Sequence, residues 1–226
     1  MIATIQEFLG EYGELLLDGT WDTLVMTTVS TFLAYVIGVP LGVLLTISAP
    51  KAIWPHRILH AVLGWIVNIG RSIPFIILLV ALIPLTRLIM GTSLGVQGAI
   101  VPLVVSAAPF VGRMVEQSLA EVDGDLVEAA QSFGAGSWAI VTKVLLFESL
   151  PSLIRGAAIT FINLFGYSAM AGTVGAGGLG DIAIRYGYQR YQYDVMVVSV
   201  VLCVILVQIF QSLGNVLARR IDHHSR

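Results

Sequence analysis

The residues of this chain that could do chemistry are few, and they are not arranged for catalysis. The long apolar segments hold no Ser, His and Asp constellation and no pair of carboxylates, which nucleophilic and acid–base catalysis require. The phosphate-binding sequence GxxxxGK followed by Ser or Thr is also absent, so the sequence predicts no nucleotide site of that kind in this chain. The histidines share no structured face with carboxylates or Cys203, and we interpret them as solvated interfacial residues, not metal ligands: His56, His60, His223 and His224.

A glycine-rich string from Gly175 to Gly180 matches the dinucleotide fingerprint GxGxxG. That fingerprint binds a dinucleotide between a strand and a helix of a βαβ unit, whereas here it closes an apolar run. We therefore reject nucleotide binding, and the sequence predicts no metal or cofactor bound by this chain. We expect the glycines to form a tight, irregular turn at the outer mouth of a membrane protein, where such backbone is allowed if it is covered or lines a cavity.

The elements that position these residues are predicted by the distribution of charge. Of the 226 residues, 57% are hydrophobic and only 12% are charged, compared with about 25% charged in a soluble domain. One run, from Arg57 to Arg87, is interrupted only by Arg71, and we expect a single helix there. Four other runs exceed the roughly 20 apolar residues of a membrane-spanning helix: 22–51, 87–113, 155–181 and 194–219. Because they lack the period-two alternation of barrel strands, the sequence predicts an all-α membrane protein with five transmembrane helices.

Lys and Arg indicate the orientation of these spans. If the long polar loop 113–155 faces the cytoplasm, the inner side holds most of the basic residues, which is the positive-inside bias. The N-terminus is then predicted outside and the C-terminus inside. The inner set is Lys51, Arg57, Arg113, Lys143, Arg155, Arg219, Arg220 and Arg226, and the outer set is Arg87, Arg185 and Arg190. No basic patch is interleaved with aromatic residues, so a nucleic-acid partner is not expected.

Residues 1–22 contain no Lys or Arg, so the positive n-region of a cleavable signal peptide is missing. Apolar residues recur in this segment at helical spacing, and acidic residues follow the same spacing on another face. Two interpretations stay open. One is a short amphipathic helix that lies at the outer surface, and the other is a frayed tail that leads into the first span.

The one long polar loop carries the most specific pattern of the chain. Asp123 or Asp125 can cap a helix whose helix-forming residues continue through Ser132. Gly134, just past that run, is placed for the left-handed conformation that ends a helix. Ser137 can cap a second, amphipathic helix. Two such helices held between membrane spans indicate a docking surface for another protein.

Within this loop the pattern Glu128-Ala129-Ala130-x3-Gly134-x9-Val144-x-Leu146 resembles the EAA loop of binding-protein-dependent ABC import permeases. This chain departs from the family pattern at Phe147, where the family has proline, and Pro151 is then the alternative end of the second helix. In that family the loop forms the coupling helix that docks on the ATPase subunit. The resemblance implies that the coupling residues are Glu128, Ala129, Ala130, Gln131, Ser132 and Gly134.

The family resemblance also implies an architecture and a set of partners. It implies the type I ABC importer permease fold, as a single transmembrane permease domain over 1–226 with its core at about 20–218 and the cytoplasmic coupling loop at 113–155. It implies a homodimer in the lipid of the bacterial inner membrane, with two ATPase subunits inside and a substrate-binding lipoprotein outside. The ATPase subunits would hydrolyse ATP, and the spans would move substrate by alternating access.

Further strings narrow the resemblance to the methionine-importing subfamily of these permeases. They run over 71–79, 108–110, 166–172, 174–181 and 186–188. They imply methionine as the substrate and a methionine-binding lipoprotein outside. The alternatives are an ABC permease for another amino acid or small solute, and an ion-coupled secondary transporter. The second alternative would need an ion site in the spans and usually internal repeats, and the sequence has no membrane-embedded acid and no repeat.

A translocation pathway or gate is predicted from polar residues inside the apolar runs. Arg71 is expected to face a central cavity together with Asn68 and Ser72, or to pair with carbonyls freed near Pro74. A shifted helix, with Arg71 snorkelling to an interface, is the alternative. Four residues of the fourth span are expected to line the pathway, although Met170 would serve equally well as packing: Asn163, Tyr167, Ser168 and Met170.

Overall fold

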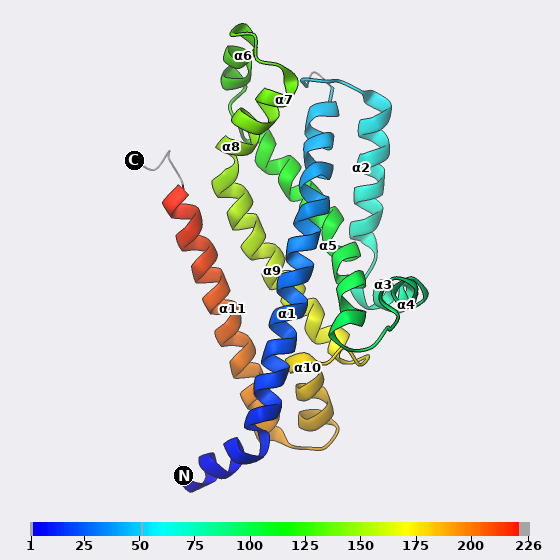
Figure 1. The fold of residues 1–226 in the computed structure, drawn as a ribbon, viewed down its shortest axis with the longest axis vertical. Coiled ribbons are helices and arrows are strands. Elements are labelled where there is room, and N and C mark those ends of the chain that lie inside the picture. Colours follow the sequence, from blue (N-terminus) through cyan, green and yellow to red (C-terminus); the bar gives the residue numbers. More distant parts are fainter. Residues whose placement is uncertain (1, 51, 222–226) are drawn as a thin grey trace. The chain divides into compact units, whose positions relative to one another are not determined.

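The computed structural model describes residues 2–50 and 52–221, and these form helices and turns without a strand (Figure 1). The predicted all-α class is confirmed. Four of the helices are long and apolar enough to cross a membrane. They are α1 (Ile2–Ser48), α5 (Gly95–Ala120), α9 (Leu150–Gly172) and α11 (Tyr193–Ile221).

The expected single helix from Arg57 to Arg87 is wrong, because the run is broken twice. It forms α2 (Arg57–Ser72), α3 (Phe75–Ala81) and α4 (Ile83–Met90). The cause lies in the residue before Pro74: Ile73 has φ −83 and ψ 122, the extended conformation that a following proline imposes. Within the described residues, the four long helices are candidate spans, and the predicted number of five is reached when the broken pair of α2 and α3 is counted as one more span.

The N-terminal segment follows neither of the two interpretations left open by the sequence. It is continuous with the first span in the 47-residue helix α1. It packs against residues that follow α9 in the chain. Leu16 is buried in an apolar cluster with Leu179 and Val195. Tyr12 Oη accepts a hydrogen bond of 2.7 Å from Gln192 Nε2. Burial of one helical face explains why this segment is neither frayed nor a separate surface helix.

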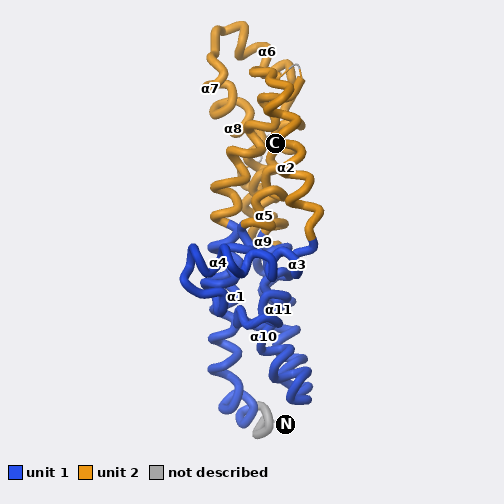
Figure 2. Tube along the Cα trace, turned by 90° about the vertical axis from the view of Figure 1, so that its right-hand side faces the viewer, with its two compact units in different colours: residues 1–31, 74–104, 161–210 blue, residues 32–73, 105–160, 211–226 orange. Residues whose placement is uncertain are grey.

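The chain divides into two compact units, each assembled from separated stretches of sequence (Figure 2). The first unit holds residues 1–31, 74–104 and 161–210, and the second holds residues 32–73, 105–160 and 211–226. The long helices α1, α5, α9 and α11 each contribute to both units. The contacts described below lie within one unit or the other.

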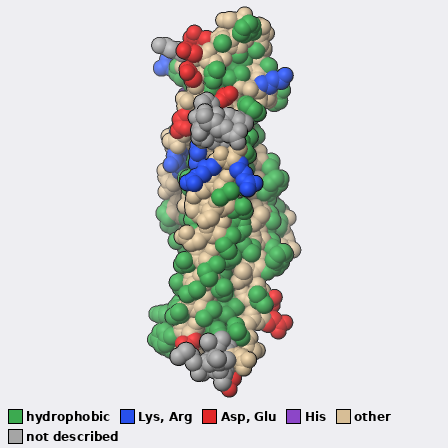
Figure 3. Space-filling model, turned by 90° about the vertical axis from the view of Figure 1, so that its left-hand side faces the viewer, with side chains coloured by type: hydrophobic (Ala, Val, Ile, Leu, Met, Phe, Trp, Pro, Cys, Tyr) green, Lys and Arg blue, Asp and Glu red, His purple; other side chains and the backbone are tan. Residues whose placement is uncertain are grey.

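The outer surface of the long helices is strongly apolar. On α11, for example, Val197, Val204 and Ile209 are each about half exposed. Figure 3 shows one face of the molecule, where hydrophobic side chains extend along the helices and charged side chains gather in separate clusters. In a soluble protein such a surface would be an aggregation hazard, whereas hydrocarbon solvates it, so the surface agrees with helices that cross a bilayer.

Within the second unit, α1 and α5 approach closely at small residues. A Cβ atom built on Gly42 would lie 2.5 Å from Val115 Cβ and 2.6 Å from the Gly112 carbonyl oxygen, and Gly38 is similarly close to Val111. Because lipid tails are as apolar as leucine, membrane helices associate through close van der Waals packing at such small residues. The two glycines therefore fix how α1 and α5 pack.

We expect Gly42→Ala to destabilise the protein, because the new methyl group would contact backbone that cannot move without separating the two helices. The cost should be about 1–3 kcal/mol, measured as a lower midpoint of thermal unfolding in detergent. The control is Gly64→Ala on α2, where an added Cβ meets nothing within 4 Å. That control should be neutral or stabilised by up to about 1 kcal/mol. Equal midpoints for the two variants would contradict the packing role of Gly42.

Candidate functional site

Helix α2 presents three different faces. With about 100° of rotation per residue, Arg57, His60, Asn68 and Arg71 fall within one polar stripe, to which the short residue Gly64 also belongs. A second face packs inside the second unit, where Val67 is fully buried and Gly70 lies against Pro109. The third face, roughly opposite the polar stripe, is apolar and exposed: Ile58, Val62 and Ile69. A helix of this kind in a membrane requires protein or water beside its polar stripe.

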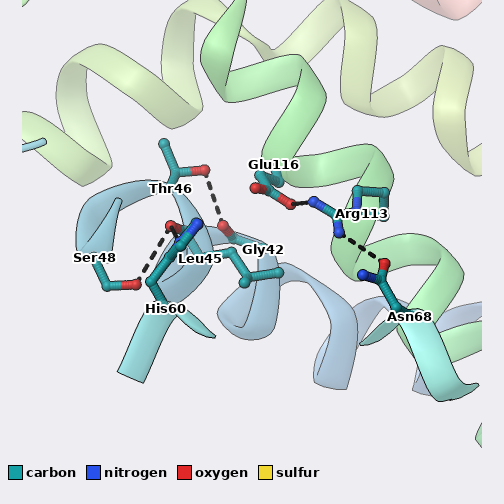
Figure 4. Close-up of polar contacts among 8 residues, drawn as sticks. All are labelled: Gly42, Leu45, Thr46, Ser48, His60, Asn68, Arg113 and Glu116. Carbon is teal, nitrogen blue, oxygen red and sulfur yellow. Dashed lines mark hydrogen bonds and ion pairs between the residues drawn. The ribbon is translucent and has the colours of Figure 1, made fainter. Parts of the chain in front are cut away.

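The polar stripe is tied to α5 by Arg113 (Figure 4). One guanidinium nitrogen, Nη2, donates to Asn68 Oδ1 at 2.9 Å, and Nη1 pairs with Glu116 Oε2 at 2.6 Å. Both charged side chains are largely buried, with exposed fractions of 26% and 18%, so each compensates the charge of the other. The arginine also fixes the orientation of the Asn68 amide.

The sequence did not predict this cluster. Arg113 was placed at the edge of the polar loop, but α5 continues to Ala120, so Arg113 and Glu116 are inside a spanning helix. The signals that could have found the cluster are the i, i+3 spacing of the two charges and the helical spacing of polar residues along α2. The segment between α5 and α9 is 121–149 in the structure, inside the predicted loop 113–155.

His60 is less solvated than the sequence predicted. Its Nδ1 lies 3.1 Å from the Leu45 carbonyl oxygen and the residue is half-buried (Figure 4). Ser48 Oγ donates to the same carbonyl. His56 is exposed and caps α2, because its Nδ1 accepts from the Leu59 N–H at 3.1 Å. The other two histidines, at 223 and 224, lie outside the described residues.

The remaining pathway candidates of α2 lie in its last turn. Ser72 Oγ donates to the Asn68 carbonyl oxygen at 2.7 Å, so the structure brings these two predicted residues together. Arg71 is exposed beside them, at the end of the helix and next to the break at Pro74.

The candidates on α9 separate into two faces. Asn163, Tyr167 and Met170 fall within about 60° of one another on the helix, and Asn163 and Met170 are exposed. The Tyr167 ring stacks on Phe75 with a centroid distance of 4.6 Å and an interplanar angle of 4°. Ser168 lies on another face and is buried, and its hydroxyl donates to the Phe165 carbonyl oxygen at 2.7 Å.

The docking loop contains the helix that the sequence predicted. Helix α6 (Gly124–Ser132) is capped by Asp123, whose carboxylate accepts from the Asp125 N–H at 3.0 Å. Gly134 has φ +79, and its N–H donates to the Gln131 carbonyl oxygen at 2.9 Å. The Ala135 N–H donates to the Ala130 carbonyl oxygen at 3.0 Å. These two bonds are the Schellman pattern, so the predicted left-handed turn at Gly134 is confirmed.

Two details after this turn correct the predictions. The cap of the second helix is Gly136 and not Ser137, because the Gly136 carbonyl oxygen accepts from the Ile140 N–H at 3.1 Å. The second helix is a sequence of short pieces, α7 (Ser137–Ile140), the π-helical η1 (Val141–Leu145) and α8 (Leu146–Glu148). Pro151 does not end it. Pro151 is instead the second residue of α9, where its missing N–H costs nothing.

Most side chains of the docking helix α6 and of the turn after it are exposed. Of the predicted coupling residues, Glu128, Ala129, Gln131, Ser132 and Gly134 are exposed and Ala130 is half-exposed. One aromatic residue that was not among the predicted coupling residues stands out here: Phe133 is 92% exposed. Large apolar side chains at this exposure on a polar loop mark a protein contact surface.

A pocket of about 590 Å³ adjoins α6 within the second unit. Glu128 and Gln131 line it together with residues of the turn after α1 and of the end of α5.

Among the described residues, no group of three or more His, Cys, Asp or Glu side chains is placed to hold a metal ion.

Comparisons with known proteins agree with this geometry. Residues 38–226 match the family model described as binding-protein-dependent transport system inner membrane component. The chain is 50% identical over 220 residues to the probable D-methionine transport system permease protein MetI of Vibrio cholerae serotype O1, covering 97% of this chain and 98% of that protein. It is 56% identical over 158 residues to the D-methionine transport system permease protein MetI of Escherichia coli K12, covering 70% of this chain and 73% of that protein.

A solved structure supports the same assignment. An inward-facing structure of the MetNI methionine ABC transporter contains a chain that superposes with a TM-score of 0.92 at 53% identity, covering 93% of this chain and 98% of that chain. The family model covers most of this chain, and the Vibrio cholerae relative aligns with 97% of it. The chain therefore belongs to the family of binding-protein-dependent transport system inner membrane components.

Proposed function

We propose that this chain is the membrane-spanning permease subunit of an ATP-driven importer that carries methionine across the bacterial inner membrane. The observation that carries the proposal is the open docking loop on a chain that has spans but no phosphate-binding sequence of its own. Methionine is supported by relatives and a solved transporter of 50% to 56% identity whose names carry that substrate.

The proposed assembly contains two copies of this permease, two ATPase subunits on the side of the docking loop and a substrate-binding lipoprotein on the other side. Glu128, Ala129, Ala130, Gln131 and Ser132 form the contact with the ATPase subunit, and Gly134 sets the angle at which this helix leaves the turn. ATP binds to the ATPase subunits. The predicted orientation, with the docking loop in the cytoplasm, is part of this proposal.

The proposed pathway uses the exposed polar residues of α2 and the exposed face of α9. Asn68, Arg71 and Ser72 supply polar groups that a zwitterionic amino acid can contact, while Asn163, Tyr167 and Met170 supply a mixed polar and apolar surface. A thioether is flexible and polarizable, which suits a gate that must pack in two arrangements. Ser168 was predicted with this set, and its buried hydroxyl is already used within α9.

Transport follows from a difference in free energy between two states. ATP binding closes the ATPase pair, each α6 moves with the subunit on which it docks, and the spans open outward toward the lipoprotein. Hydrolysis resets the spans inward. The nucleotide can shift this equilibrium only by as much as it favours one state over the other, so docking at α6 must survive the whole cycle.

The test of substrate is uptake by the reconstituted complex. Proteoliposomes that contain the permease, the ATPase subunit and the lipoprotein should accumulate labelled methionine when ATP is supplied on the ATPase side. The permease alone should hydrolyse no ATP. Competition by the other amino acids, each in excess, should leave most of the uptake intact. A different amino acid that is transported in preference to methionine would replace the proposed substrate, and uptake without ATP would overturn the proposed class.

We expect Gly134→Thr to weaken docking of the ATPase subunit while the spans remain inserted. A β-branched residue in the left-handed region costs about 1–2 kcal/mol, and the cost falls on the turn that orients α6. The matched control is Gly136→Thr, since Gly136 has φ −71 and ψ 159, which suit Thr, and Thr is an accepted N-cap residue. Copurification of the ATPase subunit should fall for the first variant only. Equal loss in both variants would mean that backbone conformation at Gly134 is not the cause.

We expect residue 71 to face water in the assembled transporter. In a Cys203→Ala background, Arg71→Cys should react with a water-soluble maleimide at least about tenfold faster than Ile69→Cys, because only an ionised thiolate reacts and Ile69 lies on the apolar face of α2. The comparison should be made with and without ATP analogue. Equal protection of both cysteines in both states would remove Arg71 from the proposed pathway.

A further inference from the structure

An apolar groove of about 600 Å³ lies along α1 within the second unit. Its floor is Val141 of η1, which is buried, and two exposed tryptophans border it, Trp54 and Trp138. Its wall on α1 is formed by bulky apolar residues over two turns: Val39, Pro40, Val43, Leu44 and Ile47. None of these residues belongs to the docking helix or to the proposed pathway.

Of the described residues that line the groove, only two carry hydroxyl groups, Ser137 and Thr142, and neither belongs to its α1 wall. The hydroxyl of Thr142, which lines it, already donates to the Trp138 carbonyl oxygen at 2.8 Å. The other lining groups are almost all hydrocarbon or indole. A ligand that occupies this groove must therefore be apolar over the part that enters it.

The shape and position of the groove suit a hydrocarbon chain. From Val39 to Ile47, α1 rises by about 12 Å, which is close to the ~15 Å thickness of hydrocarbon in one leaflet. Trp54 lies at the Ile47 end of the groove, since its backbone N–H donates to the Ile47 carbonyl oxygen at 3.0 Å. Tryptophan is enriched at the level of the lipid headgroups, so the groove extends from that level into the bilayer.

The lining argues for lipid and against another protein helix. Membrane helices pack on one another through Gly, Ala and Ser, and α1 uses its small residues for that purpose on the side of Gly38 and Gly42, which contact α5. The groove residues lie on the opposite side of α1, at about 100° per residue. The groove wall of α1 contains Val, Pro, Leu and Ile and no Gly, Ala or Ser.

Two exposed basic residues lie close in sequence to residues that line the groove. Lys143 follows the lining residue Thr142 and is exposed, and Arg57 begins α2 three residues after Trp54 and is also exposed. Basic residues beside an apolar site on this side of a membrane protein attract anionic headgroups. We propose that the groove binds one acyl chain of an anionic phospholipid of the docking-loop leaflet, with its phosphate held by Lys143.

Native mass spectrometry of the purified permease–ATPase complex tests this site directly. After incubation with phosphatidylglycerol, the complex should retain one lipid per permease copy. Val43→Phe fills the groove and should lower retention at least about threefold, because the chain loses buried contact area. The control Val62→Phe adds the same side chain to the exposed apolar face of α2, outside the groove, and should retain lipid as the unmodified complex does.

The substitution Lys143→Gln tests the contact with the lipid headgroup independently of the contact with the acyl chain. It should reduce retention of phosphatidylglycerol about fivefold, which corresponds to one basic contact, and leave weaker retention of zwitterionic phosphatidylcholine unchanged. Equal retention by the Val43→Phe and unmodified complexes would overturn the proposal. So would efficient disulfide cross-linking between permease copies that carry Leu44→Cys in a Cys203→Ala background, because a second copy would then occupy the groove. Neither readout depends on which solute is transported.

Discussion

Every backbone N–H and C=O of this chain that lies at membrane depth needs a partner inside the protein, because hydrocarbon offers none. Helices meet this requirement through their own hydrogen bonds, and the turn after α9 shows how substitutes are supplied where the helix ends. At the turn after α9, the Gly95 N–H donates to the Gly175 carbonyl oxygen at 2.8 Å, and the Leu179 N–H donates to Thr23 Oγ1 at 2.9 Å. Gly177 and Gly178 there have φ +79 and +82, so the irregular turn predicted from the glycine string is confirmed.

The same constraint makes the polar residues of the spans informative. A charge in a spanning helix is tolerated when it is compensated, as Arg113 is by Glu116 and Asn68. Three Thr hydroxyls of α1 and α9 donate to carbonyl oxygens of their own helices: Thr27, Thr31 and Thr160. Arg71 is different, because it is exposed at the end of a helix and beside a proline break. This contrast separates polar groups that stabilise the fold from those we assign to transport.

The sequence predicted the features that depend on neighbouring residues and missed those that depend on distant ones. Asp123 as a cap and Gly134 as a left-handed turn are local properties of a helix end, and both were confirmed. The contact between Arg113 and Asn68 joins residues 45 positions apart, and no local pattern indicates it. Helix ends predicted from the positions of charged residues were also inaccurate. The predicted span ended at Arg113, but Arg113 and Glu116 form an ion pair within α5, and the helix continues past them. The break after Ser72 was local and could have been predicted from Ile73-Pro74.

The docking loop is connected to the spans within the second unit by packed side chains and hydrogen bonds, and this bears on how docking could drive transport. Val141 and Leu145 of η1 are buried, which anchors the loop by apolar contacts instead of a flexible link. Beyond the loop, Ser118 of α5 and Ser152 of α9 are hydrogen bonded at 2.9 Å, and Tyr35 of α1 donates to the Leu153 carbonyl oxygen at 3.1 Å. A displacement applied at α6 therefore reaches α1, α5 and α9 together. A flexible loop would absorb that displacement locally, whereas packed helices with few voids pass it on, so the energetic preference of the ATPase pair for one state becomes a preference of the spans.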